Sequence, residues 1–268
     1  MSATPAEVRA ATAATSVHLD DVTKQYWQKG RCTTALNRCS LHIEAGEFFS
    51  LLGPSGTGKT TLLNLLAGFE RPDAGTVRIG SRDVGGPGPD RAVVFQSPTL
   101  YPWLTAAGNV AEGMRHLKLS RSQRKSRAIE QLAEVGLEHA AGRYPHQMSG
   151  GMAQRVGIAR ALAMRPDVLV MDEPFAALDA YVRREMQELA VRLQQERNVT
   201  TLFVTHSIEE ALVLSDRVAT MADGKVTEIF EVRSPHPRDV TAPDFNALRR
   251  AIADRIEAGV RAERERTR

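Results

Sequence analysis

The stretch Gly53-Pro54-Ser55-Gly56-Thr57-Gly58-Lys59-Thr60 constrains the fold of this chain more than any other. The apolar run at 48–52 before it predicts a buried strand, and the leucine-rich run at 62–67 after it predicts a helix. The pattern G-x-x-x-x-G-K-T between a strand and a helix is typical of a phosphate-binding loop. Glycines allow successive N–H groups to turn inward, and the helix N-terminus adds its positive end. We therefore expect a nucleotide-binding site here.

Two side chains of this stretch have specific expected roles. Lys59 is placed to reach the β- and γ-phosphates of a nucleotide, and the Thr60 hydroxyl to ligate Mg²⁺. The alternative is a glycine-rich turn that matches the pattern by chance, which the strand and helix around it make the weaker interpretation. The residues expected to bind nucleotide here are Gly53, Pro54, Ser55, Gly56, Thr57, Gly58, Lys59, Thr60 and Thr61.

Length and charge limit the remaining possibilities. The 268 residues suffice for one large α/β domain or for a domain with an inserted subdomain. Lys plus Arg number 35 against 32 Asp plus Glu, and so balanced a charge argues against a nucleic-acid partner. Cys32 and Cys39 lack metal-site spacing, which favours two incidental thiols in a reduced, cytoplasmic protein. No apolar run approaches a membrane span, and residues 1–15 predict a disordered leader.

The apolar pattern along the chain predicts an α/β framework that a helical segment interrupts. From 97 to 165 no strand-like run occurs, and Ser120 is a candidate N-cap for a helix inside this segment. The early strands predict a small antiparallel sheet that leads into a parallel one, and 218–230 predicts a closing hairpin. Tyr26 and Trp27 are expected to follow the first strand. The expected strands are 17–21, 41–43, 48–52, 76–79, 92–95, 168–171, 201–204, 218–221 and 226–230.

Two further constellations carry chemistry. Asp172-Glu173 ends the apolar run at 168–171, where an aspartate can hold a metal and its neighbour can polarise water. Ser149-Gly150-Gly151 precedes the helix expected at 152–164 and predicts a second anion-binding helix N-terminus. Plain helix capping by Ser149 is the alternative.

Together these motifs resemble the nucleotide-binding subunit of an ATP-binding cassette (ABC) transporter over 17–239. The loop at 53–60 resembles the Walker A motif, 168–173 Walker B, and Ser149-Gly150-Gly151 the signature motif, although Met148 and Met152 depart from its usual form. The remaining matches are Gln96 (Q-loop), 177–179 (D-loop), His206 (switch histidine) and Tyr26 (adenine-stacking aromatic). The resemblance implies an α/β P-loop NTPase of ABC-ATPase architecture, with an antiparallel β subdomain and a mainly helical insert.

The resemblance also implies roles for these residues, with ATP as substrate. Glu173 would act as general base, His206 would hydrogen-bond the γ-phosphate, and Gln96 would sense the nucleotide. Thr60, Gln96 and Asp172 would ligate Mg²⁺. Tyr26 would stack on adenine, or else it covers the sheet edge. Residues 149–151 would complete the ATP site of a second subunit in a head-to-tail homodimer or pseudo-symmetric pair.

The segment 143–147 resembles bacterial importers rather than exporters. Segments 89–96, 100–104 and 109–110 resemble the nitrate, taurine and aliphatic sulfonate branch of these importers. This branch implies a peripheral ATPase on the cytoplasmic face of the cell (inner) membrane, with a separate permease and, indirectly, a solute-binding protein. Taurine or sulfonate is favoured, with nitrate, bicarbonate or a thiamine-precursor pyrimidine next. Tyr101, Pro102 and Trp103 are expected on the surface of the insert, near where the permease docks, unless Trp103 packs inside the insert.

Two alternatives and a domain division complete the expectations. A soluble ABC ATPase that is not coupled to transport would act on DNA, ribosomes or protein assembly, and a non-catalytic regulatory module conflicts with Glu173 and His206. The domain division is a leader at 1–15, an ATPase domain at 16–236 with its helical subdomain at about 97–165, and a helical tail at 237–268. The tail either packs on the cassette or adds a dimer or regulatory contact.

Overall fold

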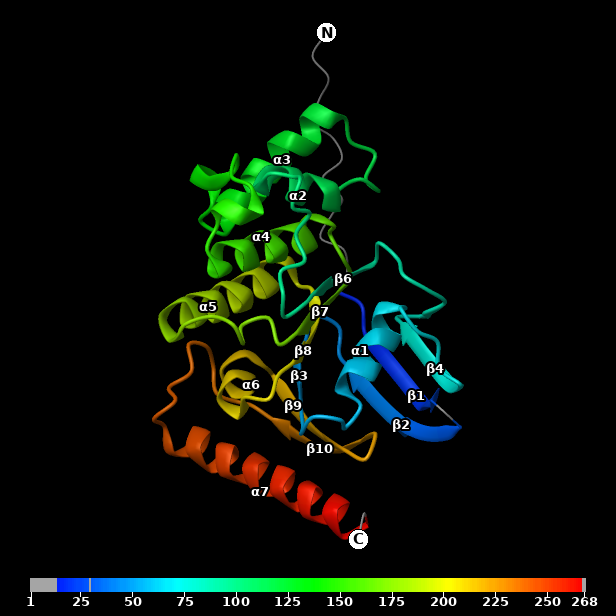
Figure 1. Cartoon of the computed structure of the whole chain (residues 1–268). Helices are drawn as coiled ribbons and strands as arrows, with labels where there is room; N and C mark the ends of the chain where they lie inside the picture. The colour runs from blue at the N-terminus through cyan, green and yellow to red at the C-terminus, as the bar shows by residue number, and fades with distance from the viewer. Residues whose placement is uncertain (1–13, 29, 267–268) are drawn as a thin grey trace.

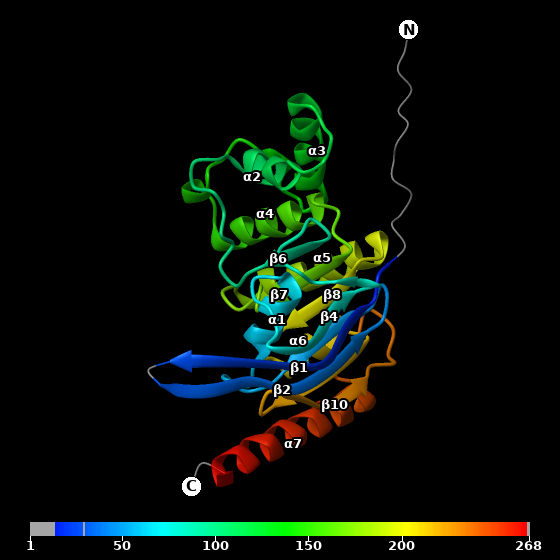
Figure 2. The ribbon, with the colours of Figure 1, turned by 90° about the vertical axis from the view of Figure 1, so that its right-hand side faces the viewer.

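A computed structural model describes residues 14–28 and 30–266 of the chain. A central mixed sheet separates a helical part, which contains α2, α3 and α4, from the smaller sheet beside α1 (Figure 1). The last helix, α7, lies on the opposite side of the molecule from the helical part (Figures 1 and 2). The predicted leader at 1–15 falls almost wholly outside the described residues.

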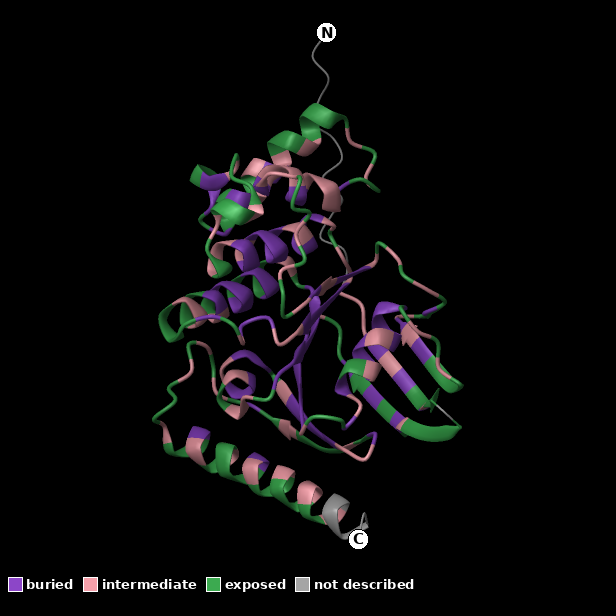
Figure 3. Cartoon of the chain, in the orientation of Figure 1, coloured by how far each residue is buried: buried purple, intermediate pink, exposed green. Residues whose placement is uncertain are grey.

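The central sheet has six strands in the order β10-β9-β3-β8-β7-β6, and all neighbours except the β9–β10 hairpin run parallel. Every residue of β3 and β8 is buried, because helices or the second sheet cover both faces (Figure 3). Strands buried on both faces have continuous apolar sequences instead of alternating ones, which explains the runs in the sequence. The strands are β3 (Phe48–Leu52), β6 (Arg91–Val94), β7 (Val168–Asp172), β8 (Thr200–Val204), β9 (Arg217–Ala222) and β10 (Lys225–Glu231).

The second sheet is antiparallel, with the order β2-β1-β4-β5. It packs through buried Val, Leu and Ile side chains against α1 (Lys59–Ala67) and one face of the central sheet. The predicted antiparallel subdomain is therefore confirmed. Its strands are β1 (Val17–Gln28), β2 (Arg31–Ile43), β4 (Ala74–Ile79) and β5 (Arg82–Asp83).

The first two strands are longer than the sequence pattern predicted. Tyr26 and Trp27 lie within β1 and pair with Thr33 and Cys32, so the prediction that they follow the strand was wrong. The physical reason is a series of register shifts in β1, where Asp21 has a φ of 50°. Irregularities of this kind break the apolar-polar alternation by which a strand is recognised.

The helical part contains α2 (Ala106–Gly113), α3 (Arg121–Glu134) and α4 (Gly150–Ala163), with the short 3₁₀ helices η1 (Glu138–Ala140) and η2 (Pro145–Gln147). Ser120 is the N-cap of α3, in a capping box with Gln123, as expected. Buried Asn109 donates its amide to the carbonyls of Tyr101 and Leu104. That loop presents Trp103, which is 70% exposed, so the alternative that Trp103 packs inside is wrong.

Three further helices cover the central sheet: α5 (Ala180–Arg197), α6 (Ile208–Leu214) and α7 (Pro243–Arg266). Phe203 on β8 packs in tilted contacts against both Phe48 and Phe175, at centroid distances of 5.9 and 5.6 Å, beneath α5. Phe245 and Ile252 of α7 are buried in a separate cluster with α6 and β9. The tail helix therefore packs on α6 and the central sheet. Both cysteines are free thiols, Cys32 exposed and Cys39 buried.

Replacing Ile252 with Ala should lower the free energy of unfolding by about 2–5 kcal/mol, because the side chain is fully buried and a cavity would remain. Denaturant unfolding measures the effect. Arg249→Ala, at an exposed position of the same helix, is the control and should change stability by about 0.5 kcal/mol or less. Equal stabilities of the two variants would contradict the packing of α7 described above.

Candidate active site

Four strands of the central sheet end at one edge, and a predicted site residue follows each of them. The loop at 53–58 follows β3, and Gln96 follows β6. Asp172 ends β7 with Glu173 directly after it, and His206 follows β8. The parallel register pairs Leu51 with Val204 and Val204 with Asp172, so these ends lie level with one another. In open α/β sheets ligands bind beyond the carboxyl ends of the strands. The topology thus brings the separate motifs to one site.

Helix α1 begins without a side-chain cap among the described residues, because its N-cap is Gly58. The helices α2 to α6 each have a side chain that accepts from the first turn, namely Thr105, Ser120, Ser149, Asp179 and Ser207. The first N–H groups of a helix have no intrahelical acceptor. At α1 these donors therefore remain available to an anion, with the positive end of the helix dipole behind them.

Three glycines of the loop serve two purposes. A Cβ at Gly53 would lie 2.6 Å from the Met221 carbonyl oxygen, and one at Gly58 2.4 Å from that of Ala35. These two glycines let the loop pack closely on β9 and β2. Gly56, with a φ of 87°, has no described atom within 4 Å of its Cβ position. It thus combines a left-handed backbone with open space, which a bound phosphate requires.

Lys59 lies inside the loop instead of extending to the surface. Its ammonium donates to the carbonyls of Gly53 and Pro54, each at 2.7 Å, and the residue is only 8% exposed. Burial lowers the pKa of Lys59, while the charges of Glu173 and Asp172 act in the opposite direction. Burial and the charge of Glu173 raise the pKa of Asp172, and Lys59 opposes this. The loop cation and the strand-end carboxylates are therefore close enough to interact.

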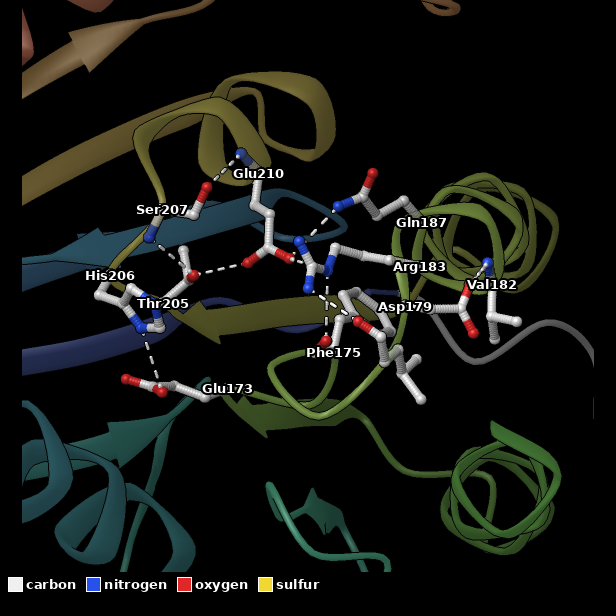
Figure 4. A network of polar contacts seen from close by, with 11 residues as sticks. Glu173, Phe175, Asp179, Val182, Arg183, Gln187, Thr205, His206, Ser207 and Glu210 are labelled. Atoms are coloured by element: carbon white, nitrogen blue, oxygen red, sulfur yellow. Dashed lines mark hydrogen bonds and ion pairs between the residues drawn. The ribbon is translucent and has the colours of Figure 1, made fainter. Parts of the chain in front are cut away.

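Glu173 and His206 contact each other directly. His206 Nδ1 lies 3.2 Å from Glu173 Oε2, and Figure 4 shows the two side chains pointing toward one another. Glu173 has a left-handed backbone, with a φ of 43°, while its N–H donates to the Val204 carbonyl at 2.9 Å. Non-glycine residues pay for this conformation, and such strain clusters at functional sites. The sequence predicted both residues but not their contact.

Gln96 is exposed and directly follows a residue held by the helical part. The amide of Gln154, on α4, donates to the Phe95 carbonyl at 3.2 Å. Gln154 is buried, and sequence analysis did not single it out. A glutamine among the buried small and apolar positions of α4 is the signal that could have found it. This bond ties the Gln96 segment to the helix that begins with the signature motif.

Tyr26 lies at the end of the antiparallel sheet nearest α1. Its hydroxyl donates to Glu70 Oε2 at 2.6 Å, and Thr61 Oγ1 is 3.4 Å away. Burial and the bond to Glu70 raise the pKa of Tyr26. The ring is therefore tethered beside the last residue of the expected binding stretch, where it is 39% exposed.

Ser149, Gly150 and Gly151 are not brought to the loop at 53–61. Ser149 Oγ caps α4 by accepting from the Met152 N–H at 3.3 Å. The three residues line a separate cavity of about 400 Å³ together with residues 177–179 and Arg155, and no residue of 53–61 lines it. Within one chain, the capping alternative describes what Ser149 does.

Comparisons with known proteins place this arrangement in a family. The family model described as "ABC transporter" matches residues 36–176. The chain is 47% identical to the taurine import ATP-binding protein TauB of Chromobacterium violaceum, over 83% of this chain and 89% of that protein. It is also 47% identical to the nitrate transport protein NasD of Klebsiella oxytoca, over 76% of this chain and 80% of that protein.

The chain belongs to the ABC transporter family. A dimeric structure of a post-hydrolysis state of the ATP-binding cassette MJ0796, bound to ADP and Pi, superimposes with a TM-score of 0.74. The sequence identity is 35%, over 82% of this chain and all of that one. These findings confirm the ABC-ATPase fold and identify the chain as an ATPase. The helices in the described part of the chain are too short or too polar to cross a membrane.

The donor set at the sheet edge fits Mg²⁺ held together with a nucleotide. Nowhere in 14–28 and 30–266 do three His, Cys, Asp or Glu side chains form a cluster that could hold a metal alone. Thr60, Gln96 and Asp172 instead offer a hydroxyl, an amide oxygen and a carboxylate. Mg²⁺ is usually held by one or two carboxylates together with substrate phosphates and water. These residues would hold the ion, which would neutralise phosphate charge.

Gly58→Ala should lower the free energy of unfolding by about 1–3 kcal/mol more than Gly56→Ala. Both substitutions place a side chain at positive φ, but only the Cβ at residue 58 meets a backbone oxygen, at 2.4 Å. Urea titration of both variants beside the unsubstituted chain measures the difference. A Gly58→Ala variant as stable as Gly56→Ala would show that the loop can move away from β2 at little cost.

Proposed function

We propose that the chain is the ATP-hydrolysing subunit of an importer for a small anionic solute, taurine or another sulfonate first, and that it acts through a separate permease. The observation that carries the proposal is the meeting of Lys59, Asp172, Glu173 and His206 at one sheet edge in a member of this family. The similarity to TauB supports the importer branch.

Each proposed role follows from the contacts of the residue. The ammonium of Lys59, now on two loop carbonyls, would exchange them for the β- and γ-phosphate oxygens of ATP. Glu173 would accept a proton from the attacking water, and His206 would donate to the γ-phosphate. Thr60, Gln96 and Asp172 would hold Mg²⁺. Tyr26 would place its ring against adenine, since it is tethered beside Thr61.

The hydrolytic unit would be a pair of such subunits. Ser149, Gly150 and Gly151 line a cavity away from their own phosphate loop. In a head-to-tail pair this helix N-terminus would face the nucleotide on the partner's loop. The dimeric form of the similar cassette MJ0796 supports this arrangement. Two buried ATP molecules would then hold the pair closed until hydrolysis.

The permease would dock at the loop that carries Tyr101 and Trp103, on the cytoplasmic face of the membrane. The two rings contact each other in a tilted arrangement at a centroid distance of 5.5 Å, and both are exposed. Arg160 of α4 donates to the Thr99 carbonyl at 3.0 Å and lies over the Tyr101 ring. A rigid aromatic surface of this kind suits a partner helix. A solute-binding protein would deliver the solute to the permease without contacting this chain.

The identity of the transported solute is the most specific part of the proposal. The identity to a taurine import protein and to a nitrate transport protein is the same, 47%. Taurine is placed first because the match to TauB covers more of both chains. A soluble ABC ATPase without a transport role is the alternative, and co-purification with a membrane permease or with nucleic acid distinguishes the two.

Glu173→Gln should retain ATP binding but lower kcat by about 10²- to 10⁴-fold, because an amide cannot take the proton of the water. Phosphate release and nucleotide titration measure the two effects. Glu209→Gln, at an exposed position on α6, is the matched control and should hydrolyse ATP at the normal rate. Unchanged phosphate release by Glu173→Gln would remove Glu173 from the proposed mechanism.

Lys59→Ala should weaken ATP binding by about 10- to 100-fold, since a hydrogen bond from a charged donor contributes about 1.5–3 kcal/mol. Titration with a fluorescent ATP analogue gives the dissociation constant. Lys225→Ala, which removes an exposed lysine from β10, is the control and should bind normally. Equal affinity of the two variants would contradict the phosphate role of Lys59.

Cells that lack this gene should lose uptake of labelled taurine. The wild-type gene should restore uptake and the Glu173→Gln variant should not, because transport requires hydrolysis. Nitrate and bicarbonate uptake are measured in the same cells. Loss of nitrate or bicarbonate uptake with normal taurine uptake would transfer the assignment to that solute, and normal uptake of all three would favour the uncoupled ATPase.

A further inference from the structure

The segment between β7 and α5 is held by one side chain from the first turn of α5. The guanidinium of Arg183 donates to the Leu178 carbonyl at 2.8 Å and, through Nε, to the Phe175 carbonyl at 3.4 Å. Asp179 caps the same helix by accepting from the Val182 N–H. Residues 175–179 thus have their backbone fixed to α5 at several points. Lysine could not make the same contacts, because it lacks the planar fork of donors.

Arg183 also faces Glu210 on the neighbouring helix α6 (Figure 4). Arg183 Nε lies 3.8 Å from Glu210 Oε1, and that carboxylate side chain is only 11% exposed. The other carboxylate oxygen accepts from the Thr205 hydroxyl at 2.7 Å, and Gln187 donates to Oε1 at 3.3 Å. Such partners offset the cost of burying a carboxylate. Glu210 therefore connects Arg183 to Thr205.

Thr205 immediately precedes His206 and is 1% exposed. Its hydroxyl oxygen accepts from the Ser207 N–H at 3.1 Å, so the residues on both sides of His206 are tied together. The His206 side chain itself is 68% exposed and touches Glu173. The network thus fixes the backbone that carries His206, while the imidazole remains accessible.

We propose that Arg183, Glu210 and Thr205 are positioning residues that couple segment 175–179 to the His206–Glu173 pair. The proposal rests on the proposed roles of His206 and Glu173 in hydrolysis. Residues 177–179 line the same cavity as Ser149, Gly150 and Gly151, which is the surface assigned to the second subunit. A second copy seated there would press on 177–179, and the chain of polar contacts would carry the displacement to His206. Closure of the pair would in this way set the rate of hydrolysis.

A purely structural role for these contacts makes a different prediction. If they only hold α5 against α6, their loss should lower stability and leave the kinetics of the folded protein unchanged. If they position His206, kcat should fall while the KM for ATP stays nearly constant, because the nucleotide-binding residues 53–61 make none of these contacts. Measurements of stability, kcat and KM on the same variant therefore distinguish a structural role from a positioning role.

Thr205→Val is the first test, since it keeps the buried shape and removes the hydroxyl. We expect kcat of the purified full chain to fall about 10-fold, with KM within about twofold, as the loss of one positioning hydrogen bond predicts. Thr205→Ser keeps the hydroxyl and should restore kcat to within about twofold of wild type. Arg184→Ala is the control, because Arg184 directly follows Arg183 on α5 and its side chain is exposed. This variant should hydrolyse ATP normally.

Arg183→Met, Glu210→Gln and the double variant give a second test that does not depend on Thr205→Val folding well. If the residues form one chain of contacts, the double variant should lose no more kcat than the more impaired single variant. Melting temperatures are measured alongside. Multiplicative losses of kcat in the double variant would contradict the coupling.

The outcomes separate this inference from the proposed function. His206→Ala should abolish most of the hydrolysis. If it does and Thr205→Val has a normal kcat, the coupling is wrong while the role of His206 stands. If His206→Ala hydrolyses ATP normally, the proposed role of His206 fails, and the coupling fails with it. If Thr205→Ser is as impaired as Thr205→Val, the hydroxyl is not the connection and the inference is overturned.

Discussion

The arrangement of this protein depends on one constraint, the level alignment of parallel strand ends in a sheet that is buried on both faces. Backbone register sets Leu51, Val204 and Asp172 side by side, and no side chain at the edge has to bring them together. Because both faces are packed, the sheet cannot slip without moving a large apolar core. The edge is therefore a rigid platform, and residues from loops far apart in sequence acquire fixed separations on it.

The polar groups at this edge differ in how fully the chain itself supplies their hydrogen-bond and charge partners. Helix α4 begins with a side-chain cap, whereas α1 begins with a glycine and leaves its donors available. Lys59 is buried against carbonyls, a site that binds a cation only weakly compared with phosphate oxygens. Burial raises the pKa of Asp172 and lowers that of Lys59, so both charged groups are poorly compensated in the chain alone. An anionic nucleotide with a divalent cation would complete these interactions.

Contacts within the chain also connect the surface of the proposed dimer to the active site. The signature residues and the segment 177–179 share one cavity, and polar contacts run from that segment through Arg183 and Glu210 toward His206. The surface that we propose for the second subunit and the histidine that we propose to be catalytic are thereby joined within one chain. The helical part is joined to the edge separately, through the bond from Gln154 to the carbonyl before Gln96. One set of contacts would connect the active site to the second subunit, and the other would connect it to the permease on the helical part. ATP hydrolysis could then respond to both partners.

The sequence alone determined the chemistry that is local in the chain: the phosphate loop, the strand-end carboxylates, the buried strands and the capped helix at Ser120. Such features depend on spacings of a few residues, which a sequence displays directly. The structure also showed that β1 extends past its register shifts, which hide the apolar-polar alternation in the sequence. Tertiary structure decided what depends on contacts between distant segments, such as the Glu173–His206 contact and the role of Gln154. It also decided that Ser149 does not reach its own chain's loop. Contacts between segments 30 or more residues apart leave no periodic trace in a sequence, because only the packing of the whole core selects them.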